Sequence, residues 1–219
     1  DSANVPLRSG GRYDPAANTW TSMSAAGAPE GTQNASSAWT GREFIVWGGT
    51  AAATEDRNTG GRYDPKTDSW TALPMSGAPE PRNRAPAVWT GREVIVLSAS
   101  NQVAGPRYLP PDVKTAPTIS SGPWTALPAA GAPTGRSDPR AAWTGREIIV
   151  WGGGVDAGTA FNTGGRYDPA TDAWSAASTV GAPSARSESS AVWTGREFVV
   201  WGGDGGAGVG ALNTGGRYN

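Results

Sequence analysis

Short apolar stretches recur along the whole chain, separated by small and polar residues. The most regular is an uninterrupted apolar run, which reads "FIVW" at 44–47, "VIVL" at 94–97, "IIVW" at 148–151 and "FVVW" at 198–201. Since polar residues do not alternate within it, the run predicts a strand buried on both faces. A shorter stretch ending in Trp precedes each run, and the letters Thr-Gly-Arg-Glu separate the two. This spacing predicts a tight antiparallel hairpin.

Two further strands are predicted in each repeat. The letters "GGRYDP" at 10–15, 60–65 and 164–169 predict a third strand that ends in an Asp-Pro turn, and "DSWTALP" at 68–74 is typical of the fourth. The whole pattern returns about every fifty residues, within the range of propeller blades. Four-stranded antiparallel units repeated along a chain predict an all-β protein, a β-propeller whose blades cover one another's faces.

The motif resembles the kelch repeat, in which a hydrophobic strand ends in Gly-Gly and is followed by a Tyr and then a Trp. The matching residues are Gly48, Gly49, Tyr63, Trp70, Gly152, Gly153, Tyr167, Trp174, Gly202, Gly203 and Tyr218. The family also has an Arg just before its first strand, matched by Arg82, Arg136 and Arg186, whereas Thr32 stands in the first copy. The resemblance implies a propeller, with the matched Gly, Tyr and Trp residues in structural roles.

On this basis we expect one kelch-type propeller domain over 1–219. It is divided into a split-blade segment at 1–37, a first repeat at 38–87, a degenerate second repeat at 88–141, a third repeat at 142–191 and a partial fourth at 192–219. The second repeat departs from the pattern, because Leu97-Ser98-Ala99 replaces Trp-Gly-Gly and a long turn is inserted at 110–122. Pro106 falls in or just before its third strand, where it is tolerable only outside a central hydrogen-bond ladder.

Both ends of the sequence carry a third strand, since Tyr13 and Tyr218 occupy equivalent positions. Three arrangements are therefore open. A four-bladed ring closes within the chain through its terminal strands, two chains exchange ends to build a larger ring, or the sequence is part of a longer array.

The composition excludes several kinds of catalysis, metal site and partner. The chain has neither Cys nor His, which excludes disulfides, thiolate or Ser-His-Asp catalysis and ordinary zinc or copper sites. We expect no cofactor and no metal. The net charge of −1 gives no electrostatic case for nucleic acid or an anionic membrane as a partner. We expect a bacterial protein with an extracellular or periplasmic location, from the Trp- and Gly-rich repeats and the absence of Cys.

Residues that every repeat shares are interpreted as structural, including the Arg-Glu pair (Arg42-Glu43 in the first hairpin), expected to serve packing or ion pairing. Binding residues are sought where equivalent loops differ. Strand parity places the segment before each first strand beside the loop after Gly-Gly, on one face. The candidate ligand-binding residues there are Asn34, Arg82, Arg84, Arg136, Asp138, Arg140, Arg186, Glu188, Asp56, Asp156 and Asp204. Among aromatic residues only Phe161 stands out in a loop.

Three functions are compatible with the sequence. The first is a non-catalytic scaffold that holds a protein or glycan partner on the varied loop face through bidentate polar contacts. The second is an assembly element that forms homo-oligomeric rings or arrays by exchange of terminal strands. The third is an enzyme similar to kelch-like sugar mutarotases, using Arg and carboxylates for acid–base chemistry. We expect the first, and so no catalytic residues.

Overall fold

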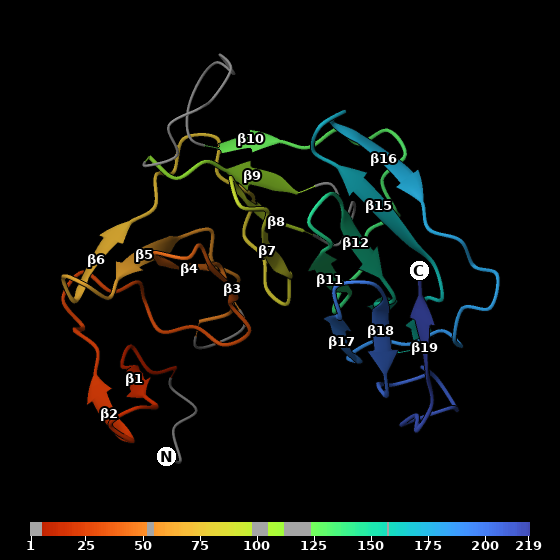
Figure 1. Ribbon diagram of the computed structural model, residues 1–219, viewed down its shortest axis with the longest axis horizontal. Coiled ribbons are helices and arrows are strands. Elements are labelled where there is room, and N and C mark those ends of the chain that lie inside the picture. The colour runs from red at the N-terminus through yellow and green to blue at the C-terminus, as the bar shows by residue number, and fades with distance from the viewer. Residues whose placement is uncertain (1–5, 52–54, 98–104, 112–123, 157) are drawn as a thin grey trace. The chain divides into compact units, whose positions relative to one another are not determined.

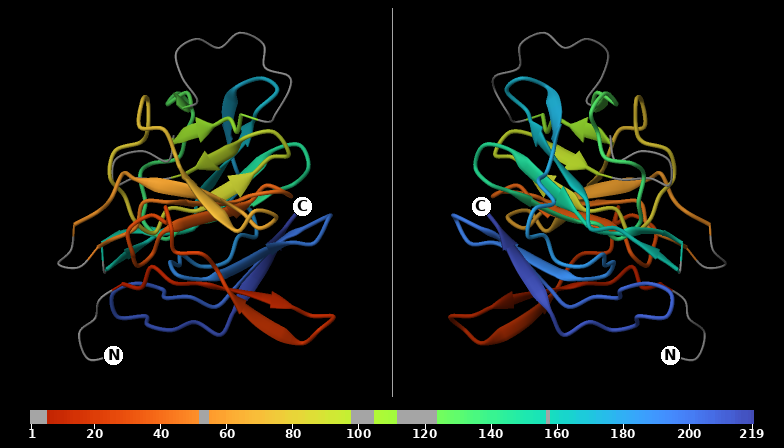
Figure 2. Two further views of the ribbon diagram at one scale, coloured as in Figure 1. Left: turned by 90° about the vertical axis from the view of Figure 1, so that its left-hand side faces the viewer. Right: turned by 90° about the vertical axis from the view of Figure 1, so that its right-hand side faces the viewer.

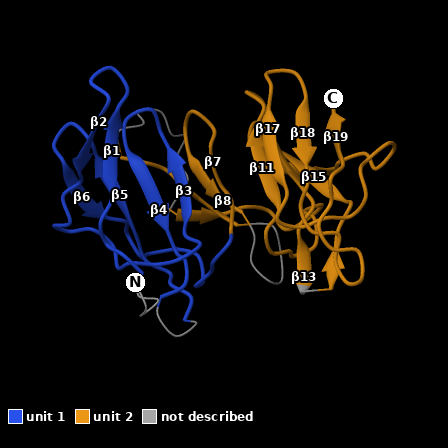
Figure 3. Ribbon diagram, turned by 90° about the horizontal axis from the view of Figure 1, so that it is seen from below, with its two compact units in different colours: residues 1–84 blue, residues 85–219 orange. Residues whose placement is uncertain are grey.

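The computed structural model describes residues 6–51, 55–97, 105–111, 124–156 and 158–219. Over these ranges the fold is all-β: the ribbons contain strands, turns and loops but no helix (Figures 1 and 2). The chain divides into two compact units, Asp1–Arg84 and Ala85–Asn219 (Figure 3). The single domain expected from the sequence stays a prediction, and each unit is described by itself.

Unit 1 contains a two-stranded hairpin and one complete sheet. The N-terminal hairpin pairs β1 (Gly11–Asp14) with β2 (Thr19–Ser22). Sheet 1 has the order β3-β4-β5-β6, all antiparallel. Its strands are β3 (Ser36–Trp39), β4 (Phe44–Trp47), β5 (Gly60–Asp64) and β6 (Ser69–Ala72).

Unit 2 contains three larger sheets and a small hairpin. Sheet 2 consists of β7 (Ala87–Trp89), β8 (Val94–Val96), β9 (Pro106–Tyr108) and β10 (Trp124–Ala126). Sheet 3 consists of β11 (Arg140–Trp143), β12 (Ile148–Trp151), β15 (Gly164–Asp168) and β16 (Ala173–Ala176). Sheet 4 has three strands, β17 (Ser190–Trp193), β18 (Phe198–Trp201) and β19 (Gly215–Tyr218). The small hairpin pairs β13 (Gly154–Asp156) with β14 (Thr159–Ala160).

Each sheet corresponds to one predicted repeat, and its first strand begins one or two residues before the expected boundary. The predicted hairpins are confirmed. In sheet 1, Trp39 pairs with Phe44, Gly41 adopts a φ of +88°, and the Thr40 hydroxyl accepts a hydrogen bond of 2.9 Å from the Glu43 amide. Only glycine adopts a left-handed backbone conformation without a steric penalty, which explains the glycine in the Thr-Gly-Arg turn.

The third and fourth strands are joined by a tilted Tyr–Trp pair. The ring centres of Tyr63 and Trp70 lie 5.2 Å apart, and those of Tyr167 and Trp174 are also 5.2 Å apart. A Cβ on Gly165 would lie 3.3 Å from a ring carbon of Trp174 and 2.5 Å from Pro133. The second glycine of the Gly-Gly-Arg-Tyr motif therefore leaves the space in which the indole ring packs.

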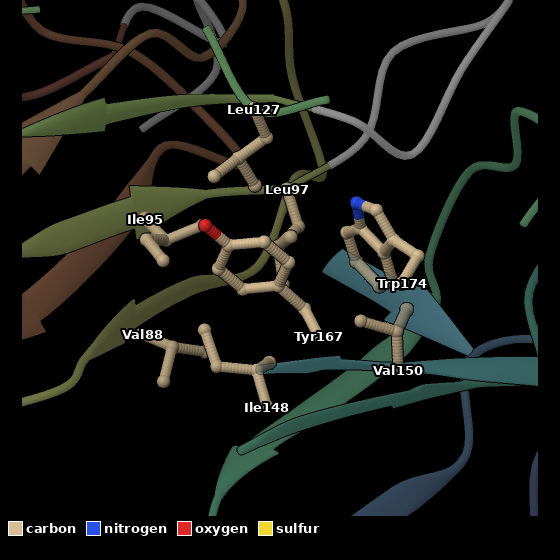
Figure 4. Packing of buried hydrophobic residues seen from close by; sticks show 8 residues of the cluster. All are labelled: Val88, Ile95, Leu97, Leu127, Ile148, Val150, Tyr167 and Trp174. Carbon is tan, nitrogen blue, oxygen red and sulfur yellow. The ribbon is translucent and has the colours of Figure 1, made fainter. Parts of the chain in front are cut away.

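A hydrophobic core cluster lies between sheets 2 and 3 (Figure 4). It combines residues from both sheets, namely Val88, Ile95, Leu97, Leu127, Ile148, Val150, Tyr167 and Trp174. Ile95, Ile148 and Val150 are fully buried, as the uninterrupted apolar runs predict. Leu97 is also fully buried. The residue that replaces the Trp of Trp-Gly-Gly in the second repeat is therefore part of the core. Ser98 and Ala99 lie outside the described residues.

Sheet 2 accommodates Pro106 at the first position of β9. Pro106 is opposite Ala126 on β10, whereas the pairing of β9 with β8 involves only Arg107 and Tyr108. A residue without an N–H is tolerated where the ladder begins. The inserted turn at 110–122 falls mainly on residues 112–123, which lie outside the described part of the chain.

Candidate binding loops

The segment before each first strand and the loop after Gly-Gly lie side by side. Backbone bridges join Gln33 to Thr50, Ser137 to Gly154 and Ser187 to Asp204. In each unit we call the surface formed by these segments the loop edge. In unit 1 it comprises 31–35, 48–51, 55–58 and 81–84, and in unit 2 it comprises 85–86, 135–139, 152–156, 158–163, 185–189 and 202–214. The opposite ends of the sheets carry the Thr-Gly and Asp-Pro turns, and we call them the turn edge.

The three arginines before the first strands are buried within the loop edge. The Arg136 side chain is 2% exposed and Arg186 is 0% exposed. Arg136 donates from Nη1 to the carbonyl oxygens of Gly152 (3.1 Å) and Thr163 (2.8 Å), and from Nε to Thr134 (2.9 Å). Arg186 repeats the pattern on the carbonyls of Ser184, Gly202 and Thr214.

These contacts give the arginines a structural role rather than the ligand contact expected from the sequence. The guanidinium groups of Arg136 and Arg186 hold the Gly-Gly loops of sheets 3 and 4 by satisfying carbonyl groups that would otherwise be buried without partners. Burial lowers the pKa of Arg136 to about 10, so the side chain remains charged at neutral pH. Arg82, which is 8% exposed, donates from Nε to the carbonyl oxygen of Glu80.

Phe161 belongs to the same structural arrangement. The Arg136 guanidinium carbon lies 4.6 Å from the centre of the Phe161 ring, a cation–π geometry. The Phe161 carbonyl oxygen accepts a hydrogen bond of 3.1 Å from the Arg186 amide, in the segment that precedes sheet 4. The one aromatic residue that stood out in a loop therefore links the loops of sheets 3 and 4 within unit 2.

Four other candidate residues share an unusual backbone conformation. They occupy equivalent positions two residues after the Arg site (Thr32 in the first copy), and their φ angles all lie between +52° and +57°: Asn34, Arg84, Asp138 and Glu188. Asn34, Arg84 and Glu188 are exposed and Asp138 is half-buried. A left-handed residue other than glycine is uncommon, and Arg and Glu are less suited to it than Asn or Asp. One strained backbone position thus presents a different polar side chain in each repeat.

Two of the remaining candidates, Asp56 and Asp204, stabilise the loops through side-chain hydrogen bonds. Asp56 accepts hydrogen bonds from Thr50 Oγ1 (3.1 Å) and Asn83 Nδ2 (2.5 Å), and Asp204 accepts one from the Gly206 amide (2.7 Å). Arg140 Nε donates to the carbonyl oxygen of Ser189 in the next repeat. The Asp156 side chain lies outside the described residues.

Sequence reasoning missed the threonines that receive the buried arginines. Thr163 Oγ1 accepts from Arg136 Nη2 (3.4 Å), and Thr214 Oγ1 accepts from Arg186 Nη2 (3.2 Å). The signal was present, because the letters "NTGGRY" occur at 58–63, 162–167 and 213–218. A Thr repeated together with the Arg indicates a pair that every repeat needs, and so a structural contact.

Comparison with models of known protein families and with curated proteins found no match to this chain. The kelch family therefore stays a resemblance carried by the motifs. The described residues include no helix long and apolar enough to cross a membrane. Within the same ranges, no three acidic side chains are grouped closely enough to hold a metal ion.

Proposed function

We propose that the protein is a non-catalytic binding module of the β-propeller type, in which the loop edge of each unit binds polar groups of a protein or glycan partner. The observation that carries the proposal is the set of four left-handed residues, Asn34, Arg84, Asp138 and Glu188. Their backbone is the same in every repeat, while their side chains are an amide, a cation and two anions. A constant framework that presents variable polar groups is the arrangement used by binding loops on rigid scaffolds.

Backbone strain supports the proposal. Glycine would fit this φ without penalty, whereas an L-residue there costs about 1–2 kcal/mol. The chain contains 32 glycines and uses them at the Thr-Gly turns and at Gly-Gly, yet not at this position. Strain of this kind persists at sites where a side chain serves a function.

The positions of the four residues suggest the chemistry of the ligand. In unit 1 the Arg84 amide donates to the Asn34 carbonyl oxygen at 2.9 Å, so a cation and an amide lie on adjacent repeats. In unit 2 the corresponding side chains are the carboxylates Asp138 and Glu188. The Arg84 side chain suits a carboxylate or sulfate, and the acidic pair suits the amine or hydroxyl groups of a ligand.

Replacing Arg84 and Glu188 together by Gly tests this proposal. Glycine adopts the positive φ of both positions without strain, so we expect the variant to keep the fold. We expect the affinity for the bound glycan or peptide on arrays to fall at least tenfold, because at least one hydrogen bond to a charged group is lost.

The matched control is Arg196→Ala, which removes an exposed arginine of the turn edge. It is expected to leave array binding unchanged. Equal binding by the double glycine variant and the wild type, or no bound ligand on either array, would contradict the proposal.

A second function, assembly through terminal strands, is favoured by an empty position in sheet 4. In sheets 1 and 3 a Trp ring carbon lies about 3.0–3.3 Å from where a Cβ of Gly61 or Gly165 would be. At the equivalent Gly216 the three nearest atoms all belong to Pro183. A small cavity of about 30 Å³ lined by Pro183, Gly216 and Tyr218 occupies that place.

The N-terminal hairpin carries a strand that fits this position. Trp20 on β2 packs over Gly11 as Trp174 does over Gly165, and its side chain is 73% exposed. Trp201 on sheet 4 is 60% exposed, whereas the equivalent Trp47 is fully buried. An edge strand with an exposed aromatic face is a template for pairing with another chain. We propose that β2 of a second copy adds to β19, with Trp20 against Tyr218.

The solution mass of the 219-residue protein tests the assembly function. Light scattering is expected to give a discrete oligomer with at least the mass of a dimer. Trp20→Ala is expected to reduce it to a monomer, because it removes the indole that would pack over Gly216 in the proposed pairing. Met75→Ala removes another half-exposed apolar side chain and should leave the mass unchanged. A monomeric wild-type protein would disprove exchange between copies.

A further inference from the structure

Ion pairs on the turn edge follow a rule in three of the four larger sheets. The Glu that ends each Thr-Gly-Arg-Glu turn pairs with the Arg of the third strand: Glu43 with Arg62 (3.2 Å), Glu147 with Arg166 (3.4 Å) and Glu197 with Arg217 (3.5 Å). In sheets 1 and 3 the turn Arg also approaches the Asp at the end of the third strand: Arg42 to Asp64 (3.6 Å) and Arg146 to Asp168 (3.9 Å). The expected ion-pair role of the Arg-Glu motif thus involves the third strand.

Sheet 2 breaks both parts of the rule. Leu109 stands where sheets 1 and 3 have the third-strand Asp, and Arg107 turns to the neighbouring sheet 3. Its Nη2 lies 3.1 Å from Asp172 Oδ2, and its Nη1 lies 3.2 Å from the Tyr167 hydroxyl. Among the described residues, no hydrogen bond or ion pair is made by the side chains of Arg92 or Glu93.

Arg92 and Glu93 line a cleft of about 790 Å³ between sheets 2 and 3, within unit 2. Trp143, Arg146 and Asp172 line it from sheet 3. Clefts that hold small molecules are roughly 300–1,000 Å³ in volume and combine an apolar surface with a few placed polar groups. The volume of this cleft falls within that range, although most of its lining residues are polar, and the cleft lies at the opposite end of the sheets from the loop edge.

Glu93 lacks the arginine partner that its counterparts in the other larger sheets have. Burial raises its pKa above the usual value, and Arg107 and Arg92 only partly oppose the shift. Partial burial of a carboxylate costs free energy unless hydrogen bonds from the protein, water or a ligand compensate for it. The equivalent Glu147 forms an ion pair with Arg166. In sheet 2 the corresponding arginine, Arg107, forms its ion pair with Asp172 instead. A ligand that donates hydrogen bonds to Glu93 would complete the site.

We propose that the cleft between sheets 2 and 3 binds a small hydroxylated carboxylate of the sugar-acid class. The Arg92 guanidinium receives the ligand carboxylate, because its planar donors match the two oxygens of that group. Glu93 accepts hydrogen bonds from ligand hydroxyl groups. The indole of Trp143 provides a flat surface for the apolar face of the sugar ring. Arg107, Tyr167 and Asp172 form the fixed network beside the ligand.

Calorimetric titration of the 219-residue protein with D-galacturonate tests the proposal, with D-galactose as the neutral comparison. We expect saturable binding of galacturonate at millimolar concentration or tighter, and at least tenfold weaker binding of galactose. Arg92→Ala should weaken galacturonate binding at least tenfold, since a charged bidentate contact is lost. Glu93→Gln should weaken binding of galacturonate several-fold without removing its preference over galactose.

Arg196→Ala is the matched control. Arg196 occupies the same turn position in sheet 4, is exposed, and does not line the cleft, so its loss should leave the affinity unchanged. Absence of saturable binding to the wild type, equal affinity for the two sugars, or an equal effect of Arg92→Ala and Arg196→Ala would each overturn the proposal. Arg92, Glu93 and Arg196 all lie outside the loop edge, so the outcome of this experiment is independent of the test of the proposed function.

Discussion

Arg136→Ala is expected to lower the free energy of unfolding of unit 2 by about 4 kcal/mol, since each buried carbonyl left without a donor costs roughly 1–3 kcal/mol. The substitution removes the donors of three carbonyl oxygens, on Thr134, Gly152 and Thr163. It also leaves a cavity beside Phe161. A small domain is stable by only about 5–15 kcal/mol, so a loss of this size is a large part of the total.

Urea unfolding followed by Trp fluorescence measures the effect. Arg136→Lys serves as a second variant, because Lys keeps the charge but lacks the planar donors that reach several carbonyls together; we expect it to lose at least half as much stability as the Ala variant. Arg196→Ala, on the exposed turn, should change stability by less than about 0.5 kcal/mol. A loss below about 1 kcal/mol for Arg136→Ala would show that the buried arginine does not hold the Gly-Gly loop.

Gly153→Ala has the second largest expected effect. Gly153 has a φ of +85°, and a Cβ there would lie 2.6 Å from the Ser137 carbonyl oxygen and 2.9 Å from the Pro139 nitrogen. Both neighbours are backbone atoms, so relief requires the two chain segments to separate. We expect the free energy of unfolding to fall by about 3 kcal/mol or more, because the strain in φ and the overpacked contact add together.

Gly145→Ala in the same sheet separates the two causes. Gly145 has a similar φ of +95°, but a Cβ there has no neighbour within 4 Å. Its loss should therefore be limited to about 1 kcal/mol, from the left-handed backbone alone. Thermal unfolding of the two variants side by side gives the cost of the close contact as the difference. Equal losses would mean that the Gly-Gly pair serves only to allow positive φ.

The hairpins show how much of the fold is predictable. The strands around Thr40 and Gly41 join residues a few positions apart, so a single short motif specifies the turn, the register and the positive φ together. The third and fourth strands are equally local, since Tyr63 pairs directly with Trp70. Four copies of these motifs are therefore enough to predict the antiparallel four-stranded sheets. The closed propeller ring stays a proposal.

The candidate site was predicted less well, for a physical reason. Arg84 and Arg136 both precede a first strand, and sequence reasoning assigned both to ligand binding. Arg84 is exposed, whereas Arg136 is buried on carbonyl groups up to 27 positions away. The backbone conformation distinguishes them, because Arg82, Arg136 and Arg186 form one aligned set and Arg84 belongs with Asn34, Asp138 and Glu188.

The sequence by itself determined the repeat, the strand order within each sheet and the exclusion of Cys- and His-based chemistry, because these depend on composition and on contacts between near neighbours. The tertiary structure decided which polar side chains are part of the framework and which line a surface. Arg107 shows why: its partners Tyr167 and Asp172 lie 60 and 65 positions further along the chain. Only the packing of sheet 2 against sheet 3 brings them together, and that same packing leaves Glu93 without the arginine that its counterparts have.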